Sequence, residues 1–177
     1  MTRTFDIFFS LLGLIIGSAI LLVIYIMCLF DTRSPIFYQV RVGLDQKPFT
    51  LVKFRTMRRN TASVATHSVD TSAITKFGLI LRQTKLDELP QLWNVLKGEM
   101  SLVGPRPGLP NQIELTKARE KYDVYSVRPG ITGLAQVSGI DMSTPELLAR
   151  TDARMIAEMS VHNYFKIIFL TFIGKKF

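Results

Sequence analysis

The sequence predicts a mixed α/β fold, with a membrane-embedded N-terminal helix followed by a small domain of short strands and amphipathic helices at the membrane interface. Three observations support this fold class. Residues 7–30 carry no charge, residues 36–40 and 48–54 have the composition of strands, and helical patterns recur after residue 75. We therefore expect an embedded helix over residues 1–31 and a membrane-associated domain over residues 32–177.

The uncharged run Ile7–Phe30 is long enough to cross the hydrocarbon core of a bilayer, because 24 helical residues extend about 36 Å. It is too long for the core of a signal peptide. Gly13, Gly17 and Ser18 interrupt the run near its middle. They permit either close helix packing or a bend that returns the chain to the side it entered from, and the flanking charges do not decide between these two topologies.

The charge of the chain is +8, and residues 1–60 alone carry eight basic and three acidic side chains. A basic block beside a membrane segment indicates the cytoplasmic face and anionic lipid headgroups. We expect no nucleic-acid partner, because the sequence has neither zinc-ligand spacing nor an aromatic RNA-binding motif. The single cysteine, Cys28, excludes an intramolecular disulfide.

Two short strands are expected at Ile36–Val40 and Pro48–Phe54, around a turn at residues 43–46. The run from Lys53 to Arg59 contains four basic residues, which could bind phosphate or face lipid headgroups. Asn60–Ser72 is polar and has the composition of a loop, and we expect His67 within it to be solvated rather than catalytic.

The most informative stretch is the short amphipathic helix predicted over Leu89–Lys97, with Pro90 in its first turn and Gly98 as its C-cap. Two adjacent carboxylates, Asp87 and Glu88, precede this helix. They could simply cap it and complement its dipole. Alternatively, one of them could act as a nucleophile, a metal ligand or a general base.

Two segments rich in proline and glycine each contain an arginine, and the first of them could either bind an anion or be an ordinary surface turn. Arg106 lies between two prolines in Gly104–Pro107, a segment that we call the elbow, so its backbone loses little entropy when the side chain binds an anion. Arg128 lies in the second such segment, Val127–Gly139, and Arg82 lies five residues before Asp87. Helices are also expected over residues 111–125 and from Thr144. The apolar segment 164–173 should lie in the membrane interface or pack on the domain.

Taken together, KFRTM at residues 53–57, DELPQL at 87–92, GPRP at 104–107 and RPGITG at 128–133 closely resemble the bacterial sugar transferase family. Its members are monotopic polyprenyl-phosphate phosphoglycosyl transferases, and the resemblance covers nearly the whole chain. It implies a catalytic domain on the cytoplasmic face of the bacterial inner membrane, behind a re-entrant N-terminal helix. The implied reaction moves a sugar-1-phosphate from a UDP-sugar to undecaprenyl phosphate, releases UMP and begins the synthesis of a surface glycan.

The same resemblance implies roles for six residues. Asp87 would be the nucleophile that forms a covalent phosphosugar and would also bind Mg²⁺, while Glu88 would assist proton removal from the lipid phosphate or position it. The phosphates would be bound by Lys53, Arg82, Arg106 and Arg128.

The chain departs from the family pattern in three places. Ala19 follows Ser18 where a proline is frequent, Val42 replaces a proline, and Ile140 stands where an arginine is common. The missing proline leaves a true span open as an alternative to the re-entrant helix. A different class of function also remains open, namely a basic, membrane-anchored scaffold protein without catalysis.

Overall fold

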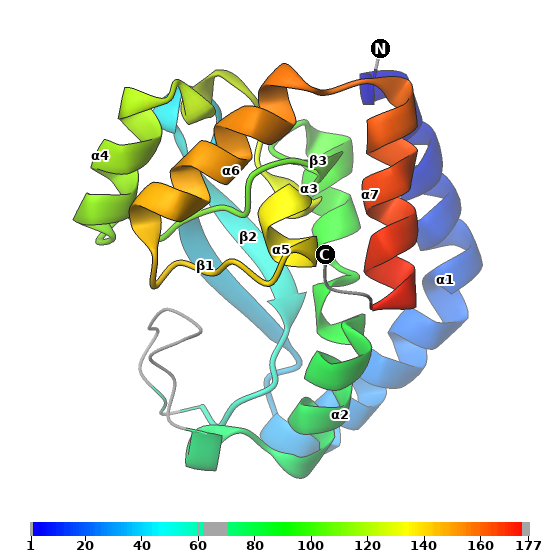
Figure 1. Cartoon of the computed structure of the whole chain (residues 1–177). Coiled ribbons are helices and arrows are strands. Elements are labelled where there is room, and N and C mark those ends of the chain that lie inside the picture. Colours follow the sequence, from blue (N-terminus) through cyan, green and yellow to red (C-terminus); the bar gives the residue numbers. More distant parts are fainter. Residues whose placement is uncertain (1, 60, 62–70, 175–177) are drawn as a thin grey trace.

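A computed structural model of the chain describes residues 2–59, 61 and 71–174 (Figure 1). It confirms the mixed α/β class, with short strands, several helices and one long apolar N-terminal helix. The loop expected at Asn60–Ser72, including His67, lies mostly outside the described residues.

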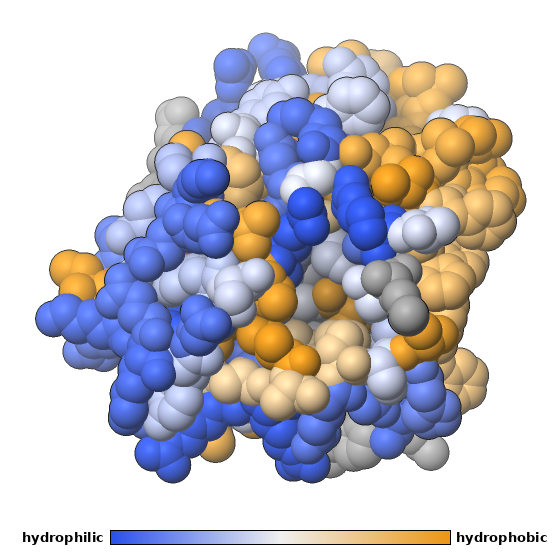
Figure 2. Space-filling model, turned by 90° about the horizontal axis from the view of Figure 1, so that it is seen from above, coloured by the Kyte–Doolittle hydropathy of each residue, from blue (hydrophilic) through white to orange (hydrophobic). Residues whose placement is uncertain are grey.

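The N-terminal helix α1, Thr2–Thr32, is continuous, and no break divides it at Ser18 and Ala19. It curves along the outer side of α7 and continues to α2 (Figure 1). Its inner face carries buried residues at helical spacing, among them Asp6, Ser10 and Cys28. Its opposite face exposes large apolar side chains, which gather on the right-hand side of the molecule in Figure 2. Helix α1 thus turns a mixed face, with polar residues near its start and Ile24 and Cys28 near its end, toward the protein, and its outward face is apolar, as expected for a helix that contacts lipid.

Both ends of α1 are bonded to the same domain. Near its start, the buried Asp6 carboxylate accepts hydrogen bonds from the Ser101 hydroxyl, the Leu102 backbone N–H and the Tyr164 hydroxyl, at 2.8–3.0 Å. Near its end, the Thr75 hydroxyl donates to Asp31 at 2.6 Å. The domain thus lies beside the helix along its length, and not only beyond one of its ends.

The two predicted strands form an antiparallel hairpin, β1 (Ile36–Val42) and β2 (Pro48–Phe54). Strand β1 extends two residues beyond the prediction. The connection is the short 3-10 helix η1, Leu44–Gln46, in which Asp45 and Gln46 take positive φ values of 50° and 59°. The face of β2 that carries Phe49 and Leu51 is buried in the domain.

The next helices are α2 (Lys76–Thr84), the 3-10 helix η4 (Leu86–Glu88) and α3 (Gln91–Lys97). Helix α3 begins at Gln91 and not at Leu89, because η4 occupies the preceding turn and Pro90 stands at the N-cap. Gly98 ends α3 with φ of 86°, as predicted.

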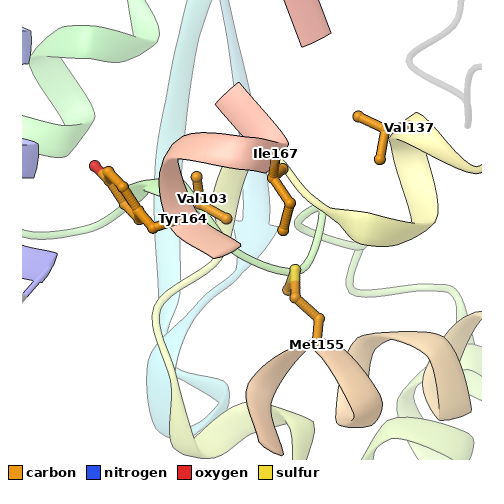
Figure 3. Packing of buried hydrophobic residues seen from close by; sticks show 5 residues of the cluster. All are labelled: Val103, Val137, Met155, Tyr164 and Ile167. Carbon is orange, nitrogen blue, oxygen red and sulfur yellow. The ribbon is translucent and has the colours of Figure 1, made fainter. Parts of the chain in front are cut away.

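A short parallel pair of strands, β3 (Ser101–Val103) and β4 (Gly130–Thr132), joins the residues just before the elbow to the second segment rich in proline and glycine. The remaining elements are α4 (Ile113–Lys121), the 3-10 helix η5 (Val124–Ser126), α5 (Leu134–Val137), α6 (Pro145–Ala157) and α7 (Val161–Ile173). Val103 packs with Val137, Met155, Tyr164 and Ile167 in a core between β3, α5, α6 and α7 (Figure 3). The apolar C-terminal segment packs on the domain through Tyr164 and Ile167 of α7, and it exposes Phe169 and Phe172, which leaves the membrane-interface alternative as a prediction.

Candidate active site

The 3-10 helix η4 places Asp87 and Glu88 in the sharp turn between α2 and α3. Helix α2 ends at Lys85, which takes a left-handed conformation with φ of 59° and turns the chain into η4. Neither carboxylate caps a helix: α3 has Pro90 at its N-cap without a side-chain hydrogen bond, and the N-cap of η4 is Lys85. Neither side chain therefore makes a capping hydrogen bond, although both lie just before the N-terminus of α3, where negative charge complements the helix dipole.

A glycine brings Arg82 to this turn. A Cβ at Gly78 would lie 2.1 Å from the carbonyl oxygen of Thr56, so only glycine allows α2 to approach the segment after β2 so closely. One turn further along α2, the Arg82 guanidinium donates from Nε to the Thr56 hydroxyl at 2.9 Å. This bond directs its positive charge toward Asp87.

Asp87 is a desolvated carboxylate, with 7% of its surface exposed. Among the residues that the structure describes, it makes no hydrogen bond through its side chain. Burial raises the pKa of Asp87 to about 6, and the adjacent Glu88 charge adds to this increase. The nearby cations, first Lys53 and then Arg82 and Arg106, oppose it. At neutral pH the group is mostly ionised but poorly solvated, which favours its action as a nucleophile.

Glu88 has a different environment, because its carboxylate forms an ion pair with Arg106 at 2.8 Å. Burial alone would raise the pKa of Glu88, but the charge and hydrogen bond of Arg106 outweigh burial and hold it below its ordinary value. The same pair raises the pKa of Arg106. The two neighbouring carboxylates thus differ in their partners. Glu88 forms an ion pair with Arg106, whereas Asp87 forms none with it.

Lys53, near the end of β2, completes the group of cations around the carboxylates. Burial lowers its pKa to about 8, although the Asp87 charge favours the protonated form. The structure therefore brings Lys53, Arg82 and Arg106 together with Asp87 and Glu88, as the sequence analysis expected.

Arg128 lies elsewhere. Its side chain is exposed and donates from Nε to the Gly98 carbonyl at 2.8 Å, at the C-terminal end of α3. Helix α3 is about 10 Å long, and Asp87 precedes its other end. The predicted phosphate-binding role of Arg128 gains no support from this position.

Arg41 is a cation that the sequence analysis did not include in the site. It is 7% exposed, and it donates to the Gln39 side chain and to the Pro107 carbonyl. Burial, together with the nearby Arg106 charge, lowers its pKa to about 10. Its inward direction could have been inferred from the alternation of β2, because Arg41 pairs directly with the buried Phe49 across the hairpin.

Asp87 is the carboxylate most suited to a metal ion, since Arg106 already occupies Glu88. No group of three or more histidine, cysteine, aspartate or glutamate side chains suited to a metal occurs among the described residues. A cation held by one carboxylate would need further oxygen ligands from a bound phosphate and from water, which is a frequent arrangement for Mg²⁺.

The model of the bacterial sugar transferase family matches residues 1–175. The chain belongs to this family. It is 39% identical over 172 residues to an uncharacterized sugar transferase, EpsL, of Bacillus subtilis, covering 97% of this chain and 85% of EpsL. It is 42% identical over 180 residues to a UDP-glucose:undecaprenyl-phosphate glucose-1-phosphate transferase of Klebsiella pneumoniae, covering 96% of this chain.

The chain matches very different fractions of the lengths of these relatives. The chain covers 88% of the exopolysaccharide production protein PSS of Rhizobium leguminosarum, at 37% identity and over 95% of its own length. It covers only 38% of the Klebsiella protein and 40% of an uncharacterized sugar transferase of Haemophilus influenzae. The motifs discussed above thus lie in a segment that these relatives share, whatever else the longer ones contain.

Proposed function

We propose that this chain transfers a sugar-1-phosphate from a UDP-sugar to undecaprenyl phosphate and releases UMP. The observation that carries the proposal is the buried Asp87 carboxylate, ionised near neutral pH and surrounded by Lys53, Arg82 and Arg106. Phosphoryl transfer depends mainly on positioning and on neutralisation of charge, and this group of residues supplies both. The names of relatives that act on UDP-glucose and undecaprenyl phosphate support the same substrates.

The transfer proceeds in two displacements at one phosphorus. A carboxylate oxygen of Asp87 attacks the β-phosphorus of the UDP-sugar, and the bond from that phosphorus to the bridging oxygen of UMP breaks. The sugar-1-phosphate is then held as an acyl phosphate on Asp87. An oxygen of undecaprenyl phosphate attacks the same phosphorus, the bond to Asp87 breaks, and the carboxylate is restored as the polyprenyl-diphosphate sugar leaves.

The cations neutralise the charge of these phosphates. With Lys53, Arg82, Arg106 and the additional Arg41 against two carboxylates, the site has a formal charge of +2, which suits a diphosphate. For Glu88, of the two roles considered, positioning is the better supported, because its lowered pKa makes it a weak proton acceptor at neutral pH.

Mg²⁺ fits this site as a cofactor held by Asp87 together with phosphate oxygens of the substrate. When bound, it would add positive charge to the phosphate being transferred.

The acceptor lipid would be reached from the cytoplasmic face of the inner membrane. The apolar outer faces of α1 and α7 lie on the same side of the molecule (Figure 2), and both ends of α1 contact one domain. Because α1 is continuous, this arrangement supports a helix that lies beside the domain at the membrane interface, and not one that turns back within the membrane. It would hold the domain at the depth where the lipid phosphate lies.

The proposal is tested by measuring UMP release from the detergent-purified chain with Mg²⁺ and a panel of UDP-sugars, with and without undecaprenyl phosphate. We expect sustained release that requires the lipid, and a single stoichiometric burst without it. The variant Asp87→Asn should lose both, whereas Asp123→Asn, at an exposed aspartate outside the site, should keep both. A folded wild-type chain that releases no UMP with any donor, and whose behaviour is indifferent to Mg²⁺, would favour the scaffold alternative.

A further inference from the structure

The elbow Gly104–Pro107, which carries Arg106, is held through its carbonyl groups. Prolines at positions 105 and 107 have no N–H, so at these positions the backbone can be held only through the carbonyls. Three successive carbonyls accept hydrogen bonds from three different elements: Pro105 from the Gly130 N–H at 2.9 Å, Arg106 from Arg119 Nη1 at 2.8 Å, and Pro107 from Arg41 Nη1 at 3.0 Å.

Arg119, on α4, makes the bond to the carbonyl of Arg106 itself. Its side chain is 2% exposed and forms an ion pair with Asp152 on α6, whose side chain is 1% exposed. Both Nε and Nη2 of Arg119 donate to the same oxygen, Asp152 Oδ2, at 3.1 and 2.7 Å. The third nitrogen group, Nη1, remains for the elbow. One planar guanidinium thus joins α4, α6 and the elbow.

Stability alone is a poor explanation of this arrangement. A buried ion pair is often no more stable than apolar side chains of the same size. Here the other oxygen, Asp152 Oδ1, is buried without a hydrogen-bond partner among the described residues, which adds a further cost. The feature that the pair does provide is a rigid donor at the carbonyl of Arg106, whose guanidinium contacts Glu88 at 2.8 Å.

We propose that Arg119, oriented by Asp152, is a positioning residue that sets the direction of Arg106 toward the two carboxylates of the active site. This inference rests on the proposed function and deepens it. Lysine cannot replace Arg119, because a single ammonium lacks the planar fork that bonds Asp152 on two nitrogens and the elbow on the third. Arg41 holds the next carbonyl, so the elbow keeps part of its support when Arg119 is changed.

The test uses a double variant, Arg119→Met with Asp152→Leu, which removes the pair without leaving a single buried charge. A second variant, Arg119→Lys, keeps the charge and the pairing with Asp152. The matched control is Arg154→Met with Glu158→Gln, which removes an exposed ion pair on the same helix α6. Each chain is purified in full length and studied for UMP release and for thermal unfolding.

We expect the double variant to fold and to unfold at a temperature no lower than that of the wild type. Its kcat for UMP release should fall by about 10- to 100-fold with little change in KM, because small displacements of catalytic groups are costly. Arg119→Lys should show the same lower kcat with little change in KM, because it keeps the buried charge but loses the bond to the elbow. A readout without turnover is the hydrogen exchange of the Gly130 N–H, which donates to the Pro105 carbonyl of the elbow and should exchange faster in both variants.

Two outcomes would overturn the inference. One is a folded double variant with kcat within twofold of the wild type. The other applies if the double variant does not fold: Arg119→Lys would then have to show the lower kcat and the faster exchange of the Gly130 N–H, and wild-type values in it would refute the positioning role. A wild type without UMP release refutes the proposed function, while an unchanged exchange rate of the Gly130 N–H in Arg119→Lys would still refute the inference that Arg119 holds the elbow.

Discussion

Replacing Asp87 by asparagine should make the protein more stable while abolishing its activity. Asp87 is 7% exposed, and in the folded chain its pKa is raised from 3.8 to about 6. Each pKa unit corresponds to 1.36 kcal/mol, so ionised Asp87 opposes folding by up to about 3 kcal/mol at neutral pH. Asparagine has the same shape and no charge. We expect Asp87→Asn to raise the free energy of unfolding by about 1 to 3 kcal/mol.

The stability that Asp87→Asn gains over the wild type should increase with pH. Between pH 3.8 and about 6 the folded wild type retains the Asp87 proton and the unfolded chain has lost it. The wild type therefore loses stability as the pH rises through this window. The advantage of Asp87→Asn should be small near pH 4 and complete above about pH 7.

The assay is thermal unfolding in detergent at several pH values, followed by the fluorescence of Trp93, the single tryptophan of the chain. A gain of 1 to 3 kcal/mol corresponds to an increase of about 3 to 10 °C in Tm for a chain of this size. Asp123→Asn, at an exposed position with φ of 53° that asparagine also tolerates, should leave Tm nearly unchanged. A lower Tm for Asp87→Asn than for the wild type at pH 8 would refute the desolvation argument.

Three further predictions concern pH, the N-terminal helix and the elbow. UMP release should have a bell-shaped pH profile, rising through about pH 6 as Asp87 ionises and falling above about pH 8 as Lys53 loses its proton; a flat profile between pH 5 and 9 would contradict these assignments. The variant Asp6→Leu should lower the free energy of unfolding by about 3 kcal/mol or more, measured by thermal unfolding, because it leaves two hydroxyls and one backbone N–H without their acceptor. Gly130→Ala should lower both Tm and UMP release, since its Cβ would lie 2.0 Å from a backbone nitrogen of the elbow, whereas Gly17→Ala, with no atom within 4 Å, should be neutral or stabilising.

Features encoded by neighbouring residues could be predicted from the sequence. The hairpin, the end of α3 at Gly98 and the long apolar helix each depend on local composition, and all three are present in the structure. Boundaries were less accurate where turns compete, as at α3, which starts two residues later than expected because η4 takes up Asp87 and Glu88.

Features that depend on distant residues could not be predicted in the same way. The parallel pair β3 and β4 joins segments about 30 residues apart, and each strand is too short to show a pattern of its own. Arg41 and Arg119 both donate hydrogen bonds to carbonyls of the elbow, and no local spacing reveals these contacts. The position of Arg82 near Asp87 could be expected from its spacing of five residues, whereas Lys53 and Arg106 were expected there because the motifs resemble a family.

The polar inner face of α1 has a consequence for the order of events during biosynthesis. Asp6 finds its hydrogen-bond donors on β3 and α7, nearly 100 and 160 residues later in the chain. Until those segments have been translated and folded, a bilayer would receive α1 with an uncompensated carboxylate, which is costly in hydrocarbon. Stable insertion of α1 into the membrane should therefore follow synthesis and folding of the domain. The helix would then enter the membrane together with the folded domain, and not before it.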